Sequence, residues 1–233
     1  DNNAISDSTI RDRTDAAAVP LQLLYIDGSG AATSSGITIS NNRFINFDLS
    51  AITSSAAENL TISGNTISQT AARTSGLGPI QVLLNQGSSA VSGNTVRDHS
   101  TNSTFTGLRI QGNVGSIGVS ANRIHNIDNA PGSAGQLTGV ELDGSSGASS
   151  VTMVNNMISI TPGTASAQAV IGVNDLRTAG SLTMNYNSVL VGGTATGSNS
   201  WAYRRVTGAA SSVSLTGNLL FNNRTGPVDN FAI

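Results

Sequence analysis

The chain has 233 residues, of which 38% are apolar, 4% aromatic and 10% charged, and its formal net charge is −2. All eleven cationic residues are Arg, they form no basic cluster, and no apolar run reaches the length of about 18 residues that a membrane span needs. These properties argue against nucleic-acid binding and membrane insertion, and the absence of Cys excludes disulfides and thiolate metal sites.

The first predicted element is an apolar strand that ends at a Gly, residues 21–28 (LQLLYIDG). Residues 37–40 (ITIS) follow, and they alternate apolar and small polar side chains with the period of two that is typical of a strand buried on one face. Both patterns return along the chain. The first recurs at 80–87, 107–112, 139–144, 169–177 and 202–208, and the second at 60–63, 151–154, 182–185 and 213–216.

An Asn follows the alternating strand in each unit, and an apolar residue stands two positions after that Asn. A third strand is expected to begin just beyond it, and the segments of most variable length lie between this third strand and the next unit. The Asn residues are separated by 23, 29, 28, 34, 31 and 31 positions; they are Asn42, Asn65, Asn94, Asn122, Asn156, Asn187 and Asn218.

Three short strands in a unit that cannot bury its apolar face alone predict an all-β solenoid, in which each coil adds one strand to each of three parallel sheets. We expect about 7 to 8 coils in a single domain over residues 1–233, which we interpret as a segment of a longer chain. The recurring Asn is expected to occupy a left-handed bend and to form an internal ladder of amide hydrogen bonds from coil to coil.

These repeats resemble the right-handed parallel β-helix repeats of the pectate lyase-like superfamily, in which one bend often carries an Asn ladder. The resemblance spans nearly the whole chain. Residues 187–226 are similar to repeats of long bacterial secreted and cell-surface proteins. The superfamily includes lyases, glycoside hydrolases, esterases, tailspikes and adhesins, so the resemblance implies a fold without selecting an activity.

In the enzymes of this superfamily the ligand groove lies over the strand that precedes the Gly turn, so the outward residues of this strand are the candidate site. We count these residues back from the Gly, and Glu141 and Asp143 then share one face of a strand as paired carboxylates require. Asp175 and Arg177 follow the same pattern with an ambiguous register. The outward residues are Tyr25, Asp27, Leu84, Gln86, Arg109, Gln111, Glu141, Asp143, Arg205 and Thr207.

The candidate ligand-binding strip therefore comprises Arg109, Gln111, Glu141, Asp143 and Arg205, joined by Trp201 and Tyr203 as aromatic platforms for a sugar ring. Opposite charges on neighbouring exposed strands also form ordinary cross-strand ion pairs, and this structural interpretation is the favoured one. Glu141, Asp143 and Asp175 are the only candidates for catalysis, and they are weak ones.

No metal or other cofactor is expected. His99 and His125 lie in neighbouring coils without a carboxylate motif, which makes a poor metal site, and we expect both side chains to be exposed. Calcium binding remains an alternative that depends on Asp143 alone.

The favoured hypothesis is an extracellular or cell-surface β-helix module that is structural or adhesive, not enzymatic, and that binds a polysaccharide or surface glycan. Two alternatives stay open: a polysaccharide lyase or glycoside hydrolase, and a filament subunit that associates end to end because its terminal coils expose unpaired strand edges.

Overall fold

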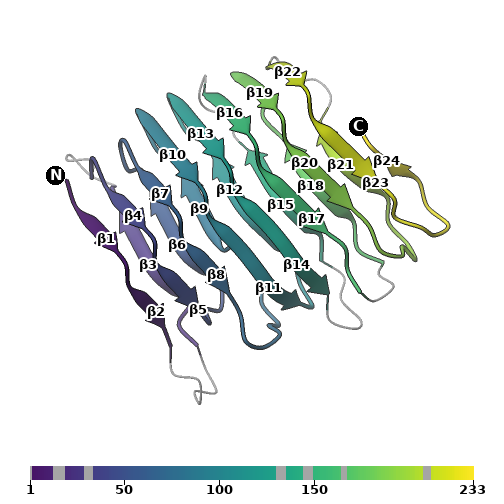
Figure 1. Ribbon diagram of the computed structural model, residues 1–233, viewed down its shortest axis with the longest axis horizontal. Coiled ribbons are helices and arrows are strands. Elements are labelled where there is room, and N and C mark those ends of the chain that lie inside the picture. Colours follow the sequence, from purple (N-terminus) through teal and green to yellow (C-terminus); the bar gives the residue numbers. More distant parts are fainter. Residues whose placement is uncertain are drawn as a thin grey trace.

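The chain folds into a β-solenoid of about seven turns built from three parallel sheets, as expected. The computed structural model describes residues 2–12, 19–28, 34–129, 135–143, 149–163, 167–206 and 211–233, and this part of the chain contains strands but no helix. Successive coils lie side by side in one row, with the N- and C-termini at opposite ends (Figure 1).

Each sheet has eight strands, one from each successive coil. Sheet A consists of β1 (Ala4–Ser6), β4 (Thr38–Ser40), β7 (Thr61–Ser63), β10 (Ser88–Ser92), β13 (Ser116–Ser120), β16 (Ser150–Val154), β19 (Ser181–Asn185) and β22 (Ser212–Thr216). Sheet B consists of β2 (Thr9–Arg11), β5 (Arg43–Ile45), β8 (Thr66–Ser68), β11 (Thr95–Thr101), β14 (Arg123–Asn129), β17 (Met157–Ile160), β20 (Ser188–Val191) and β23 (Leu219–Asn222). Sheet C consists of β3 (Gln22–Asp27), β6 (Ser50–Ser55), β9 (Ile80–Leu83), β12 (Phe105–Gln111), β15 (Leu137–Asp143), β18 (Val170–Asp175), β21 (Ser200–Arg205) and β24 (Asn230–Phe231).

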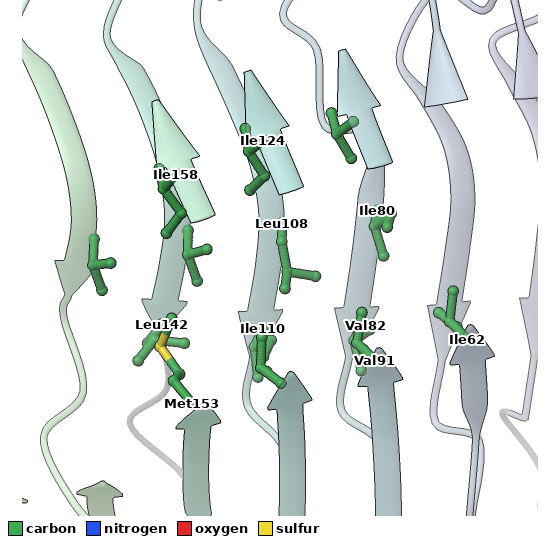
Figure 2. Packing of buried hydrophobic residues seen from close by; sticks show 14 of the residues in the cluster. Ile62, Ile80, Val82, Val91, Leu108, Ile110, Ile124, Leu142, Met153 and Ile158 are labelled. Carbon is green, nitrogen blue, oxygen red and sulfur yellow. The ribbon is translucent and has the colours of Figure 1, made fainter. Parts of the chain in front are cut away.

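The core is a set of apolar columns that run along the solenoid axis (Figure 2). The period-two pattern of sheet A turns one apolar side chain of each strand inward, where it stacks on the equivalent residue of the next coil. One such column is Ile39, Ile62, Val91, Val119, Met153 and Met184. All six are fully buried, and burial of such a side chain contributes about 1.5–3 kcal/mol.

The bend between sheets A and B differs from the expectation in one respect. The left-handed residue is not the ladder Asn but the residue before it, and none of the seven ladder Asn residues has a positive φ. A ladder Asn with an ordinary backbone is free to turn its amide into the coil. The left-handed positions are Asp7, Asn41, Gly64, Gly93, Ala121, Asn155, Tyr186 and Gly217, with φ between 51° and 65°.

The predicted Asn ladder is confirmed. The Oδ1 atom of each Asn from Asn65 onward accepts a hydrogen bond from the backbone N–H and another from the Nδ2 of the Asn one coil earlier. Each Nδ2 also donates to a sheet A carbonyl one coil back, such as Asn122 to Val91 at 2.8 Å. The first coil has Ser8 at this position, and its backbone N–H donates to Asn42 Oδ1 at 3.0 Å.

Three glycines inside sheet C strands, Gly107, Gly139 and Gly172, are required by close packing. A Cβ on Gly139 would lie 2.4 Å from the Ile158 side chain and 2.5 Å from the Gly172 carbonyl oxygen. A Cβ on Gly172 would meet Val189 at 2.2 Å in the same way. Residues of consecutive coils can therefore be matched by counting from these glycines.

Candidate functional site

The outward face of sheet C gathers most of the predicted strip in two rows. In the first row Arg109 pairs with Glu141, which pairs in turn with Asn174 and then Arg204. In the second row Gln111 pairs with Asp143. The structure therefore brings together Arg109, Gln111, Glu141 and Asp143 on adjacent strands.

One guanidinium holds both candidate carboxylates. Arg109 Nε lies 3.2 Å from Glu141 Oε1, and Arg109 Nη2 lies 3.3 Å from Asp143 Oδ2. The second oxygen of Glu141 accepts a hydrogen bond from Asn174 Nδ2 at 3.4 Å. The Glu141 side chain is only 13% exposed and that of Asp143 is 29% exposed, so these groups form a semi-buried ion-pair network.

A small hollow of about 170 Å³ adjoins this network. Arg109 and Gln81 form one side of it, and Leu49, Thr104 and residues 76–78 form the rest. Gln81 was not among the predicted residues. The prediction for this coil was Leu84 and Gln86, counted from Gly87, whereas the register places Gln81 beside Arg109 and Leu83 beside Gln111.

Asp175 and Arg205 were predicted to face outward, and this is wrong. Asp175 pairs with Leu142 on one side and with Arg205 on the other, so both belong to the inward column that begins with apolar residues. Asp175 is fully buried. The outward residues are their neighbours Asn174 and Arg204, and counting from Gly172 instead of Gly180 gives this register. Thr207 lies outside the described residues.

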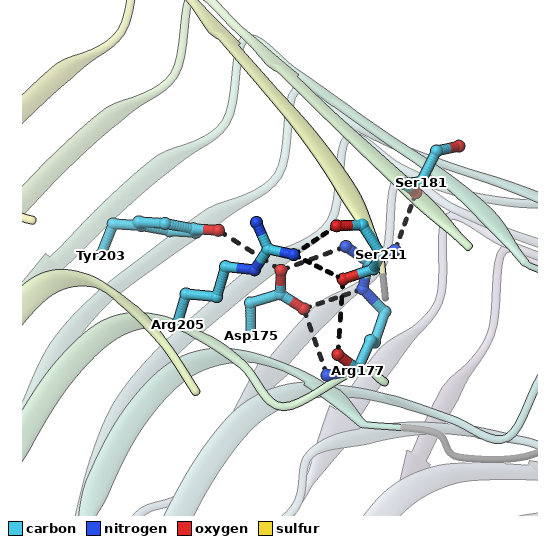
Figure 3. Close-up of polar contacts among 6 residues, drawn as sticks. All are labelled: Asp175, Arg177, Ser181, Tyr203, Arg205 and Ser211. Carbon is cyan, nitrogen blue, oxygen red and sulfur yellow. Dashed lines mark hydrogen bonds and ion pairs between the residues drawn. The ribbon is translucent and has the colours of Figure 1, made fainter. Parts of the chain in front are cut away.

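The buried Asp175 carboxylate is satisfied by a polar network inside the solenoid (Figure 3). Arg177 donates from Nε to Oδ1 at 2.8 Å and from Nη2 to Oδ2 at 3.1 Å, and its Nη1 donates to the Ser181 carbonyl at 2.7 Å. Arg205 donates to the hydroxyl and the carbonyl oxygen of Ser211. Arg177, also predicted to face outward, is buried as well.

Tyr203 is part of the same network and does not face a ligand on the surface. Its side chain is 3% exposed, and its hydroxyl donates to Asp175 Oδ2 at 3.3 Å. Burial, followed by the nearby Asp175 carboxylate, raises the pKa of Tyr203 above its usual range. The prediction of a sugar platform at Tyr203 is therefore wrong, because the ring lies in the core.

Trp201 remains on the surface of the last coils, half-buried in β21. Its ring stacks on Phe231 with a centroid separation of 5.8 Å and an interplanar angle of 14°. The guanidinium of Arg204 lies 5.0 Å from the Trp201 centroid, within the range of a cation–π interaction. The cationic partner of Trp201 is thus Arg204.

The two His residues differ from each other. His125 is half-buried and pairs with Arg97 across sheet B. His99 was expected to be exposed, and this is wrong: it is 1% exposed and its ring packs between Phe47 and Phe105 at 5.7 Å and 5.4 Å. Burial lowers the pKa of His99 to about 3, against a smaller opposing effect of contact with the Ile67 backbone, so the ring is neutral at pH 7. Neither nitrogen makes a hydrogen bond of good geometry in the described part of the chain.

A larger cavity, of about 460 Å³, lies at the end of sheet B where the strands of four coils turn toward sheet C. Residues 69–72, 98–100, 126–128, Thr161 and Gly163 line it. Sequence analysis missed this cavity, because turns of unequal length form it and no repeated residue marks it. Within the described ranges no cluster of three or more His, Asp or Glu side chains could hold a metal ion.

No protein-family model, curated protein sequence or solved structure matches the chain. Among the residues that the structure describes, no helix has the length and apolar character needed to span a membrane.

Proposed function

We propose that the chain is an extracellular or cell-surface β-solenoid module, structural or adhesive, that binds a glycan on the outward face of sheet C. The observation that carries this proposal is the state of the three candidate catalytic carboxylates. Arg109 engages both Glu141 and Asp143, and Asp175 is sealed in the core. Paired acid and base catalysis on a sugar needs two carboxyl groups that reach the substrate, and this arrangement favours binding over turnover.

The sheet C face has the chemistry that a polar glycan requires. Gln81 and Gln111 supply amide donors and acceptors, and the Arg109 guanidinium lies beside the 170 Å³ hollow. Arg109 is already paired with Glu141 and Asp143, so the face offers carboxylate and amide groups to the hydroxyl groups of a glycan. Trp201 adds an aromatic ring and Arg204 a guanidinium at the C-terminal end of the same sheet.

Assignment to one superfamily is a narrower claim than the β-solenoid fold itself. The Asn ladder at the A–B bend and the three-sheet coil support assignment to the right-handed parallel β-helices of the pectate lyase-like superfamily. The similarity of residues 187–226 to bacterial surface repeats supports a bacterial origin and a secreted location.

A glycan array combined with assays for reducing sugars and unsaturated products tests the function. We expect glycan binding that weakens at least tenfold in Arg109→Gln, with no product formed. Product formation that disappears in Asp143→Asn would establish the lyase or hydrolase alternative and overturn the proposal. Absence of both binding and turnover would reject a glycan-binding role.

End-to-end association is a second candidate, and a charge asymmetry favours it. Residues 1–58 include seven acidic residues and three Arg, whereas residues 167–233 include two acidic residues and four Arg. In the last coil Leu215 is 37% exposed, although the residue in the same column one coil earlier, Met184, is fully buried. A second copy of the chain would cover this end with a coil of opposite charge. Light scattering over a concentration series tests this; a constant monomer mass at low and high salt would contradict it.

A further inference from the structure

The 460 Å³ cavity at the end of sheet B has the size and lining of a ligand site. Its volume falls within the range of about 300–1,000 Å³ that is typical of small-molecule sites. Four consecutive coils contribute to it, and a spacing of about 4.8 Å between coils gives a trough about 14 Å long, parallel to the solenoid axis. The trough is therefore suited to an elongated ligand.

The polar groups of the cavity are only partly used by the protein itself. Asp128 Oδ1 accepts hydrogen bonds from the backbone N–H groups of Gly163 and Asn129, whereas its Oδ2 accepts none from the described residues. Asn126 donates from Nδ2 to Asp98 at 3.1 Å, and its Oδ1 has no donor within the same ranges. The free oxygens of Asp128 and Asn126 can accept hydrogen bonds from a ligand that brings hydroxyl or amide donors.

The charged side chains of the cavity restrict the class of ligand that it can bind. Of the described residues that line the cavity none is an Arg, and the acidic ones are Asp98 and Asp128, which disfavours an anionic ligand. A divalent cation is disfavoured as well, because Arg97 and Asn126 already engage Asp98 and leave Asp128 as the one available carboxylate. A neutral, hydroxyl-rich ligand fits both restrictions.

We infer that this trough binds a neutral oligosaccharide. Asp128 Oδ2 and Asn126 Oδ1 accept hydrogen bonds from sugar hydroxyls, and the carboxylate makes the stronger of these contacts. Ala71, Ala72 and Ile127 supply the apolar part of the wall, against which the C–H groups of the sugar pack. This site is separate from the face of sheet C, and neither proposal depends on the other.

Isothermal titration calorimetry with cellotetraose, mannotetraose, maltotetraose and chitotetraose tests the inference on the 233-residue chain. We expect at least one of these neutral sugars to bind with a dissociation constant below about 1 mM. Asp128→Ala should weaken that binding at least tenfold. Ala72→Trp, at an exposed loop position, should abolish binding by filling the trough while leaving the circular dichroism melting curve unchanged.

Arg123→Gln is the matched control, because this exposed side chain at the start of β14 does not line the trough, and the change should leave neutral-sugar binding within about twofold of wild type. Ca²⁺ alone and trigalacturonate are titrated in parallel. The inference is overturned if none of the four neutral sugars binds, if Asp128→Ala and Ala72→Trp leave the binding intact, or if Ca²⁺ binds at Asp128 and the sugars do not.

Discussion

The Oδ1 atom of Asn156 lies 3.0 Å from the backbone nitrogen of Asn122 and also 3.0 Å from its Nδ2. One buried acceptor thus satisfies a main-chain and a side-chain donor of the preceding coil. The Asn156 amide in turn donates to the Val119 carbonyl at 2.9 Å and to Asn187 Oδ1 at 2.8 Å. The bend therefore depends on this one side chain for hydrogen bonds to three neighbouring residues.

We predict that Asn156→Ala lowers the free energy of unfolding by about 3 kcal/mol or more, because it leaves several buried donors and acceptors without partners. Urea denaturation followed by circular dichroism measures the change. Asn185→Ala is the control, since its amide makes no hydrogen bond within the described part of sheet A, and it should cost less than about 0.5 kcal/mol. Equal losses in the two variants would show that the ladder adds no specific stability.

The residue before the ladder Asn has left-handed backbone angles, and exchanging Gly and Ala at this position should change stability in opposite directions. Ala121 has φ 53° and Gly93 has φ 64° at equivalent positions of neighbouring coils. Ala121→Gly should raise the unfolding free energy by up to about 1 kcal/mol because it relieves backbone strain, and Gly93→Ala should lower it by about 1–2 kcal/mol. A Cβ on Gly93 has its nearest neighbour at 3.8 Å, so the cost is conformational and not a steric clash. Changes of the same sign in both variants would contradict this assignment.

The fold was predictable from the sequence because two local signals agree in each coil that carries a ladder Asn. The first is an apolar residue at alternate positions of a strand, and the second is the Asn at the bend that follows this strand. The same signals missed β6, whose sequence SAITSS contains one large apolar residue. Its inward Ser54 stands where the neighbouring coils have Ile26 and Val82, so period-two hydrophobicity fails there.

The candidate site was less predictable for a geometric reason. The number of residues between each upstream strand and the Gly that follows it varies along the sequence, so counting back from that Gly shifted the register at Asp175 and Arg205. The glycines inside the strands are constrained by contact with the next coil, and counting from them places Asn174 and Arg204 correctly. The sheet B cavity depends on how four unequal turns lie together, which no repeat in the sequence encodes.

Asp175→Asn should lower the free energy of unfolding by about 3–5 kcal/mol, because it leaves the Arg177 guanidinium buried without a counter-charge. Asp143→Asn, in the semi-buried ion-pair network on sheet C, should lower the free energy of unfolding by less than about 1 kcal/mol. Guanidinium denaturation of both variants makes the comparison. Asp175→Leu combined with Arg177→Met should recover most of the loss, and a double variant as unstable as Asp175→Asn would show that the charges are needed for more than mutual compensation.

His99 should make stability depend on pH. The unfolded chain protonates this ring near pH 6.5, whereas the folded chain, in which burial lowers the pKa, does so only at about 3. Unfolding therefore takes up a proton between these values, and the free energy of unfolding falls by about 1.4 kcal/mol per pH unit as the pH drops through this window.

Denaturation of wild type and His99→Leu at a series of pH values isolates this contribution. At pH 7 the variant should be close to wild type in stability. The His99 ring nitrogens of wild type make no hydrogen bond of good geometry within the described ranges, so the substitution loses none. As the pH falls from about 6.5 toward 3, wild type should become progressively less stable than the variant. Parallel curves over the whole range would mean that His99 is protonated equally in both states.

The A–B corner takes up two residues in each of the coils that carry a ladder Asn, although those Asn residues are 23 to 34 positions apart. Additions and losses of sequence are thus absorbed at the other two corners, where they alter surface loops without shifting the strands. A whole coil, cut between one ladder Asn and the next, is then an exchangeable unit: it can be duplicated, deleted or grafted with new loops while the stacking of its neighbours is restored across the junction. The solenoid can change what it displays without changing how it is built.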